Sequence, residues 1–200
     1  IAMAALLGMR GERRILFLSL VYLGYEDSTV TSALSTAERL ALLTSHDNQY
    51  EFRHALYTQR LVSRMSYTQR SKFHSAAAIT FANETRYMAA MAHLAQSEKT
   101  DDISFGETVA RTAFEISQGN GDHAGSTESG QWLLDNTDLS VAQRVNVLIQ
   151  LAKSQIAIGR RIEGRKNAEL AARLAGTIND TEAEANATMQ WAARSDFTPD

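Results

Sequence analysis

The sequence predicts a mainly α-helical protein that contains one short β-hairpin. Proline, which interrupts helices, occurs once in the 200 residues, as Pro199. Alanine is abundant, and β-branched residues are sparse outside short runs, which favours helices. The alternation typical of a half-buried strand is clear where the apolar Tyr50 and Phe52 alternate with the polar Glu51 and Arg53.

Three helices are expected before the hairpin. The first covers residues 4–9. The second covers residues 15–23, where apolar residues on every side indicate burial, and Gly24 ends it. Polar and acidic residues at 26–29 cap the third helix, expected over residues 27–41. The apolar face of this third helix consists of Val30, Leu34, Ala37 and Ala41.

The hairpin and the helix after it complete a recognisable arrangement. A strand over residues 42–44, a polar turn over 45–48 and the strand that ends at Arg53 form the hairpin. The following helix is expected to have an apolar face formed by Ala55, Leu56, Leu61, Val62 and Met65. The order helix, helix, hairpin, helix predicts a winged helix.

Two further helices and a polar segment end this module. One helix opens at Tyr67 and is broken at residues 83–85, and the next covers residues 87–95. The polar residues 97–102 are the predicted linker. The sequence is therefore divided into a winged-helix-like module with extra helices over residues 1–96 and a second module over residues 103–200.

The second module repeats itself with a register of about 40 residues. In each unit a helix ends at a glycine turn and a second helix follows, and a third unit begins near Thr181. This pattern predicts tetratricopeptide-like helical hairpins that bury one face on their neighbours and leave a groove. The matched residues are Phe105 with Val145, Val109 with Ile149, Ile116 with Ile156, Gly119 with Gly159, Ala124 with Gly164 and Leu134 with Leu174.

Residues 1–95 resemble a known family. The resemblance is carried by residues 38–43, Glu-Arg-Leu-Ala-Leu-Leu, then by residues 50–56, Tyr-Glu-Phe-Arg-His-Ala-Leu, and by the basic helix at residues 69–74, Gln-Arg-Ser-Lys-Phe-His. Together these segments resemble the part that follows the nucleotide-binding core in the signal-transduction ATPases with numerous domains (STAND), especially the large LuxR-type, MalT-like bacterial transcriptional regulators. In that family an ATPase core precedes the winged helix, and tetratricopeptide-like repeats follow it.

The resemblance implies a cofactor and two partners for the full-length protein. The cofactor is ATP or ADP, and the partners are the protein's own ATPase core and an unidentified inducer or protein on the helical repeats. This chain itself lacks a Gly-Lys-Ser/Thr phosphate loop, so neither a cofactor site of its own nor enzymatic activity is expected here. In related ATPases with a Met-His-Asp motif, the matching histidine contacts the terminal phosphate of the nucleotide in the resting state. That role falls to His54, beside Arg53, although Ala55 stands where the motif has aspartate.

Residue types alone leave two interpretations of the basic residues open. A histidine at a helix N-terminus is suited to bind phosphate, but it also serves as a structural residue that bonds to the hairpin backbone. A set of five cations is suited to contact phosphate or an acidic domain, or it forms a solvated face with intrahelical ion pairs. These cations are Arg53, Arg60, Arg64, Arg70 and Lys72.

Other candidate sites receive structural interpretations. The glycine-rich residues 119–125 lack a lysine and a preceding strand, so they are interpreted as a turn between helices. Met88 and Met91 are interpreted as core residues. No catalytic set can be assembled, and the remaining histidines show no metal-ligand spacing, so no catalytic residue and no metal site are predicted. These histidines are His46, His74, His93 and His123.

Composition limits the partners and the compartment. The net charge of −3 and the pI of about 6.0 argue against nucleic-acid binding. The third helix carries Glu26, Asp27 and Glu38 against Arg39, so no direct DNA binding is expected. There is no cysteine and no apolar run long enough to cross a membrane. We expect a cytoplasmic chain cut from a longer protein.

Two classes of function follow. By resemblance, the chain is the regulatory and interaction part of an ATP-dependent bacterial transcriptional regulator, which restrains the ATPase core and senses a ligand or partner through the helical repeats. The alternative is a helical-repeat scaffold for protein–protein interaction that has no nucleotide role. A pure repeat scaffold does not require the hairpin at residues 42–53, which therefore favours the regulator.

Overall fold

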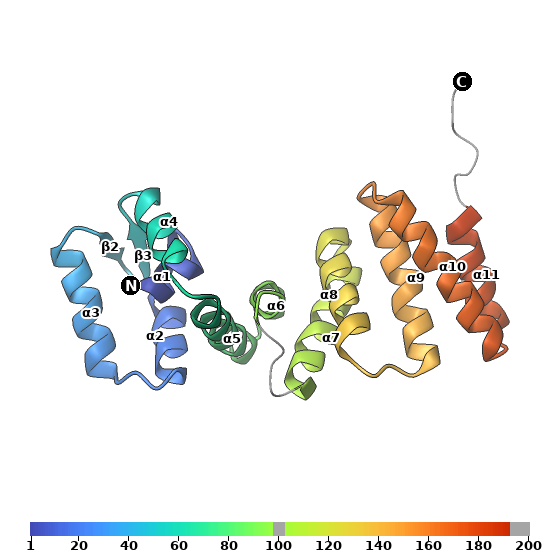
Figure 1. The fold of residues 1–200 in the computed structure, drawn as a ribbon, viewed down its shortest axis with the longest axis horizontal. Helices are drawn as coiled ribbons and strands as arrows, with labels where there is room; N and C mark the ends of the chain where they lie inside the picture. The colour runs from blue at the N-terminus through green and yellow to red at the C-terminus, as the bar shows by residue number, and fades with distance from the viewer. Residues whose placement is uncertain (98–102, 193–200) are drawn as a thin grey trace, which may run out of the picture. The chain divides into compact units, whose positions relative to one another are not determined.

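The computed structural model describes residues 1–97 and 103–192, and over these residues the protein is mainly α-helical with a small antiparallel sheet, as predicted (Figure 1). The chain divides into two compact units, Ile1–Thr100 and Asp101–Asp200. Most of the predicted linker, residues 98–102, and the end of the predicted second module, residues 193–200, lie outside the described residues.

Unit 1 has the element order and strand order of a winged helix. The sheet order is β1-β3-β2, and both strand pairs are antiparallel. Two more helices, α5 and α6, follow the winged helix. The elements are α1 (Ala2–Leu7), β1 (Arg10–Glu12), α2 (Arg13–Tyr22), α3 (Asp27–Arg39), β2 (Leu43–His46), β3 (Gln49–Phe52), α4 (Ala55–Ser63), α5 (Tyr67–Asn83) and α6 (Tyr87–Leu94).

Strand β1 was not predicted from the sequence, and its place depends on Tyr50. Gly11 lies opposite Tyr50 in the register of β1 and β3. A Cβ atom at residue 11 would collide with the Tyr50 ring, so this position admits only glycine without a shift of the strand. The Tyr50 hydroxyl donates a hydrogen bond of 3.0 Å to the Ala4 carbonyl, and this bond ties the sheet to α1.

The core of unit 1 forms between the sheet and the helices. Tyr50 and Phe52 are fully buried while Gln49 and Glu51 are exposed, which confirms the predicted alternation. Strand β2 continues to His46, so the turn is shorter than predicted. The largest buried side chains of this core are Met3, Leu16, Val30, Leu34, Leu43, Tyr50, Phe52, Met65 and Phe73.

Three predicted apolar faces need correction. The second helix is not buried all round, because Val21 and Tyr22 at its end are exposed. On α3, the residues predicted at 30, 34 and 37 are buried, but Ala41 lies beyond the helix and is exposed. On α4, Ala55 and Leu56 are exposed, and Leu56 keeps 58% of its accessible surface.

The buried face of α4 is turned toward Thr58. Its hydroxyl donates to the Ala55 carbonyl at 2.7 Å, so the polar side chain is satisfied within the helix and can be buried. Leu61 and Val62 pack against the core from the same helix. Leu56 and Tyr57 therefore point away from the core.

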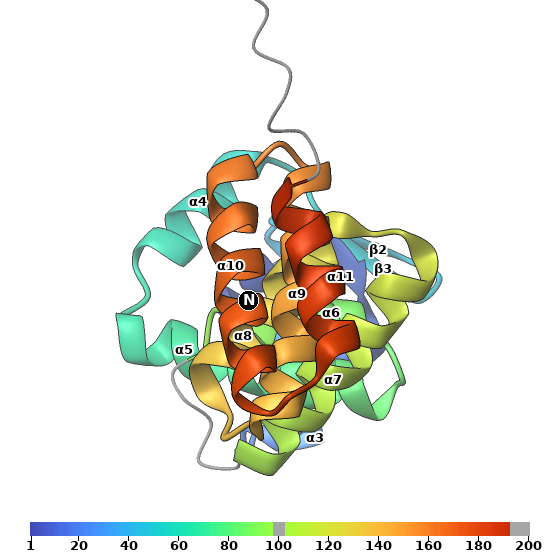
Figure 2. The same ribbon diagram turned by 90° about the vertical axis from the view of Figure 1, so that its right-hand side faces the viewer.

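Unit 2 is a succession of helices in which each packs on the next (Figure 1). Helix α11 also contacts α9, and Figure 2 shows α9, α10 and α11 grouped together. Buried residues of α9, α10 and α11 form one apolar cluster around Leu148 and Ala171. The helices are α7 (Ile103–Asn120), α8 (His123–Asn136), α9 (Val141–Ala157), α10 (Arg161–Thr177) and α11 (Thr181–Ala192).

The first two units of the repeat in unit 2 lie 38 residues apart and the third begins 40 residues after the second, so the register of about 40 holds only roughly and the predicted residue pairs, which are 40 apart, are wrong. The two turn glycines with positive φ are Gly121 and Gly159, which lie 38 residues apart, and Gly119 lies within α7. With this offset the buried Val109, Ala113 and Ser117 correspond to the buried Val147, Leu151 and Gln155. The earlier pairing of Gly119 with Gly159 placed every match two residues out of register.

Candidate functional site

The candidate site begins where strand β3 leads into α4. His54 has extended backbone (φ −150°) and is the N-cap residue of α4. Its Nδ1 accepts a hydrogen bond of 3.2 Å from the Leu56 N–H, while the Arg53 N–H donates to the Leu42 carbonyl at 3.1 Å. The structural interpretation of His54 expected a bond to the hairpin; the bond instead goes to the first turn of α4.

The second ring nitrogen of His54 is not engaged in the part of the chain that the structure describes. Because Nδ1 accepts a hydrogen bond, the neutral ring carries its proton on Nε2. His54 is exposed, and within the described residues Nε2 forms no hydrogen bond. The ring lies 6.1 Å from the Tyr57 ring, between centroids. The Nε2–H group is therefore a donor available to an external phosphate or carboxylate oxygen.

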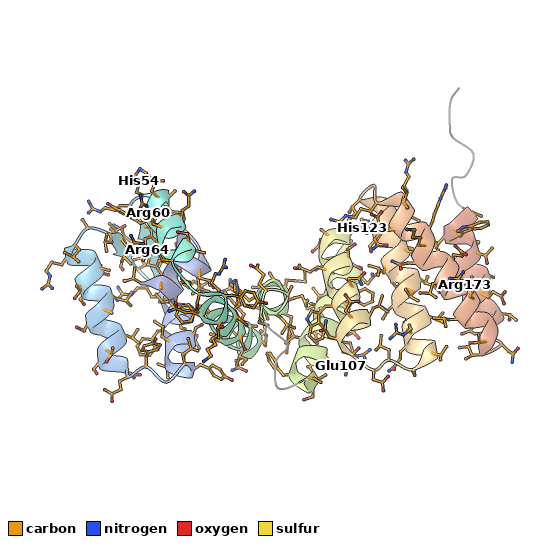
Figure 3. The ribbon with its side chains drawn as sticks, viewed as in Figure 1. His54, Arg60, Arg64, Glu107, His123 and Arg173 are labelled. Atoms are coloured by element: carbon orange, nitrogen blue, oxygen red, sulfur yellow. The ribbon has the colours of Figure 1, made fainter. Side chains whose placement is uncertain are left out.

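Three arginines accompany His54. Arg53, Arg60 and Arg64 are exposed, and none forms an ion pair with another residue in the described part of the chain. Helix α4 contains no acidic residue, so the predicted intrahelical pairs do not form there. Arg70 and Lys72, the other two predicted cations, lie on α5. Figure 3 shows His54, Arg60 and Arg64 along α4.

Two exposed apolar side chains lie among these cations. Leu56 is 58% exposed and Tyr57 is 41% exposed. Together with Arg60 and Arg64 they recur at the three- and four-residue spacing of one helix face. We call this set the α4 surface; it consists of Arg53, His54, Leu56, Tyr57, Arg60 and Arg64. Its chemistry suits a partner that offers acidic or phosphate groups beside apolar contact.

Helix α3, which reads DNA in many winged helices, lacks a comparable set of cations. Glu38 is engaged within the unit: it contacts Arg13 at 3.4 Å and the Ser45 hydroxyl. Arg39 is the basic residue of the last turn, and Asp27 lies in the first.

The glycine-rich residues 119–125 form the connection between α7 and α8. Gly121 has φ 68°, and Asp122 is the N-cap of α8, where its carboxylate accepts a hydrogen bond of 3.0 Å from the Gly125 N–H. A carboxylate at this helix N-terminus repels phosphate. The connection therefore has the form of the predicted turn.

One cluster, the pair of His74 and His93, was not predicted from the sequence. Their Nδ1 atoms lie 2.9 Å apart, although the residues are 19 positions apart in the sequence. The two positions lie on either side of the turn at residues 83–85, on α5 and α6, and no local pattern in the sequence indicates how these two helices pack. His46, on β2, and His123, on α8, are exposed.

In residues 1–97 and 103–192, no group of three or more histidine, aspartate or glutamate side chains is arranged to hold a metal ion. Within the same ranges no helix has the length and apolar character needed to cross a membrane.

Comparisons with protein families, with curated proteins and with solved structures found no match for this chain.

Proposed function

We propose that this chain is the regulatory and interaction part of an ATP-dependent bacterial transcriptional regulator of the LuxR type. The winged helix of unit 1 restrains a nucleotide-binding core in its resting state, and the helical repeats of unit 2 receive an inducer or a protein partner. The observation that carries the proposal is the α4 surface, where an imidazole N–H and three guanidinium groups are exposed and form no hydrogen bond or ion pair within the described residues.

The chemistry of this surface favours an anion. The N-terminus of α4 adds the positive end of a helix dipole to the donors of His54 and Arg53. Hydrogen bonds from a guanidinium to a phosphate oxygen are charge-assisted and stronger than neutral ones. A nucleotide phosphate on the core, with acidic residues around it, would satisfy the whole set.

Regulation by this contact requires two states of the protein. In the closed state the α4 surface packs on the ADP-bound core, and in the open state it is released. An inducer on unit 2 shifts the balance only if it binds the open state more tightly than the closed state. Exchange of ADP for ATP then permits assembly of the active regulator.

The alternative proposal is a helical-repeat scaffold without a nucleotide role. It is favoured by the hydrogen bond from Leu56 to His54, because a histidine that caps α4 has a structural task that needs no phosphate. Under this alternative the α4 surface is solvated, and unit 2 alone provides the binding function.

Nucleotide titration of the protein that contains this chain and the proposed core separates the two. The variants are His54→Ala, which removes the cap and the imidazole, and His54→Asn, which keeps a good N-cap and removes Nε2. The regulator predicts that both variants lose ADP affinity by about 5- to 150-fold, the range of a coupling free energy of about 1–3 kcal/mol, with ATP affinity unchanged.

The control is His123→Asn, because His123 is also an exposed histidine at the start of a helix. This variant should bind both nucleotides as the wild type does. Wild-type ADP affinity in His54→Asn would reduce His54 to a capping residue and favour the scaffold.

A further inference from the structure

The proposed function makes no use of the histidine pair between α5 and α6. His74 on α5 is buried, with 8% of its surface exposed, and His93 on α6 is half-buried. Their Nδ1 atoms are 2.9 Å apart and their ring centroids 5.1 Å apart. One ring therefore donates its Nδ1–H to the bare Nδ1 of the other.

This bond tolerates one added proton but not two. The ring that donates through Nδ1 has a bare Nε2, which can take a proton while the bond remains. The ring that accepts through Nδ1 already carries its proton on Nε2. It can be protonated only at the nitrogen that forms the bond, and two imidazolium rings would then repel each other at this distance.

Within the described residues, helix α6 has few contacts besides those with α5, so the His74–His93 contact matters for keeping it in place. It has eight residues, Tyr87–Leu94, and a helix of this length is not stable alone in water. It packs chiefly on α5 and buries Ala90, Met91 and Leu94. The Phe81 ring of α5 stacks on His93 at 5.4 Å between centroids. The pair thus joins α6 to the helix that holds it.

The charges around the pair are mainly positive. Burial, together with Arg70, lowers the pKa of His74, and burial, together with His74, lowers the pKa of His93 to about 4. Arg86 lies over the Phe81 ring, 4.9 Å from its centroid. The other ionisable groups on the elements packed against α5 and α6 are the Ile1 amino group, Arg13, Arg14 (paired with Glu84 at 2.8 Å), Tyr22, Tyr67, Lys72, Tyr87 and Glu12 (paired with Arg86 at 2.6 Å).

We propose that the His74–His93 pair is a proton-sensitive contact that holds α6 on α5 while at least one ring is neutral and releases α6 when both rings are protonated. Acidification then opens one short helix at the end of unit 1 and leaves the winged helix folded. This inference is independent of the nucleotide proposal, because it needs no core and no phosphate.

Hydrogen exchange of the full chain, read helix by helix at pH 7.5 and pH 5, tests the proposal. With a pKa of 6.5 for His93 in the open state and about 4 in the closed state, linkage predicts that the protection factor of α6 amides falls about 30-fold between these pH values. Amides of α2, in the same unit, should stay more strongly protected than those of α6 at both pH values, because they exchange only when the whole unit unfolds.

The matched variant is His93→Asn. The amide oxygen of asparagine accepts a hydrogen bond from the Nδ1–H of His74 whether that ring is neutral or protonated, so α6 should keep its protection at pH 5. His74→Asn provides the same test from the other side if the first variant does not fold. His46→Asn, at an exposed histidine in β2, should behave as the wild type does.

Three results would overturn the proposal. The first is a wild-type α6 whose protection factor changes by less than about threefold, well below the change that linkage requires. The second is an α6 as strongly protected as α2 at pH 5, which would indicate that α6 opens only when the whole unit unfolds. The third is an asparagine variant that folds and opens as the wild type does at pH 5.

Discussion

The two ring nitrogens of His54 have different roles. Nδ1 accepts the hydrogen bond that starts α4, and Nε2–H is free to donate to a partner. A cap of this kind needs the neutral ring, because a protonated Nδ1 is a donor. The same side chain therefore caps α4 and offers a donor to a partner. Substitutions are needed to separate its contribution to stability from its contribution to binding.

Replacement of His54 tests how much its N-cap bond contributes to the stability of unit 1. His54→Ala should lower the free energy of unfolding of unit 1 by about 0.5–2 kcal/mol, because α4 loses its N-cap bond. His54→Asn should retain most of the stability. Urea denaturation followed by tyrosine fluorescence measures both, since all six tyrosines lie within residues 1–97. Equal stability of His54→Ala and the wild type would show that the cap contributes nothing.

Gly11 allows a matched test of close packing against Tyr50. Gly11→Ala should destabilise unit 1 by about 1–3 kcal/mol, because the new methyl group collides with the Tyr50 ring. Gly119→Ala should leave unit 2 unchanged or stabilise it by about 0.5–1 kcal/mol, since residue 119 lies in α7 with open space beside it. Urea denaturation of the two variants measures both changes. A Gly11→Ala protein as stable as the wild type would contradict the packing of β1 against Tyr50.

Within the described residues, six helices end in the same way, with one residue in the left-handed region. The residue that follows each turn residue donates its backbone N–H to the carbonyl of the residue five positions before it. Arg86, which follows Thr85, donates in this way to Phe81 at 2.8 Å. This is the Schellman motif, which favours glycine at the turn residue. The six turn residues are Gly24, Ala41, Thr85, Gly121, Gly159 and Asn179. Thr85, with its branched Cβ, is the least suited of them.

Glycine at the two unsuited turns should stabilise unit 1. Thr85→Gly and Ala41→Gly should each raise the free energy of unfolding by up to about 1 kcal/mol, because they remove the steric cost of a positive φ. Gly24→Ala, at the same place in α2, should lower it by a similar amount. Thermal melts of the three variants give the ranking; a Thr85→Gly protein less stable than the wild type would contradict the account of these turns.

The elements that could be predicted from the sequence are those with a strong repeating pattern. Alternation located β3, and helical spacing located the buried face of α3 up to Ala37. Strand β1 was missed because three residues that include a glycine show no period. The repeat register was wrong by two residues because Gly119 and Gly121 look alike in the sequence, and only the backbone at Gly121 has the left-handed φ.

The candidate site could be predicted only in part. The sequence pointed to His54 and its arginines, and the structure places His54, Arg60 and Arg64 together on α4. Nothing in the sequence indicated that Leu56 and Tyr57 lie at the surface, because apolar residues in a helix fit a buried face as well as an exposed one. The pairing of His74 with His93 depends on how α5 packs on α6, which no local pattern records.

At the scale of the molecule, we expect the two units to differ in how their stability depends on pH. Because burial lowers the pKa of His74 and of His93, the folded state of unit 1 binds fewer protons than the unfolded state below pH 6.5. The stability that depends on the pair is therefore complete above pH 6.5 and is lost as the pH falls toward 4. The single histidine of unit 2, His123, is exposed.

Denaturation at several pH values should show this difference. Between pH 7.5 and pH 5 the free energy of unfolding of unit 1 should fall by about 2 kcal/mol more than that of unit 2. Both tryptophans, Trp132 and Trp191, lie in unit 2 and all tyrosines lie in unit 1, so the two transitions can be followed separately. Parallel loss of stability in both units would contradict the assignment to the histidine pair.

The most direct test of the proposed restraint is the binding of this chain to a separately produced nucleotide-binding core of the parent protein. Isothermal titration with ADP-loaded and ATP-loaded core should show tighter binding to the ADP form. Arg60→Glu and Arg64→Glu should each weaken that binding by about tenfold or more, because the α4 surface meets an acidic or phosphate group. Arg173→Glu, on α10 and paired only with Glu169 at the surface, should leave it unchanged. Equal affinity for the two nucleotide forms, or charge reversals on α4 without effect, would contradict the restraint.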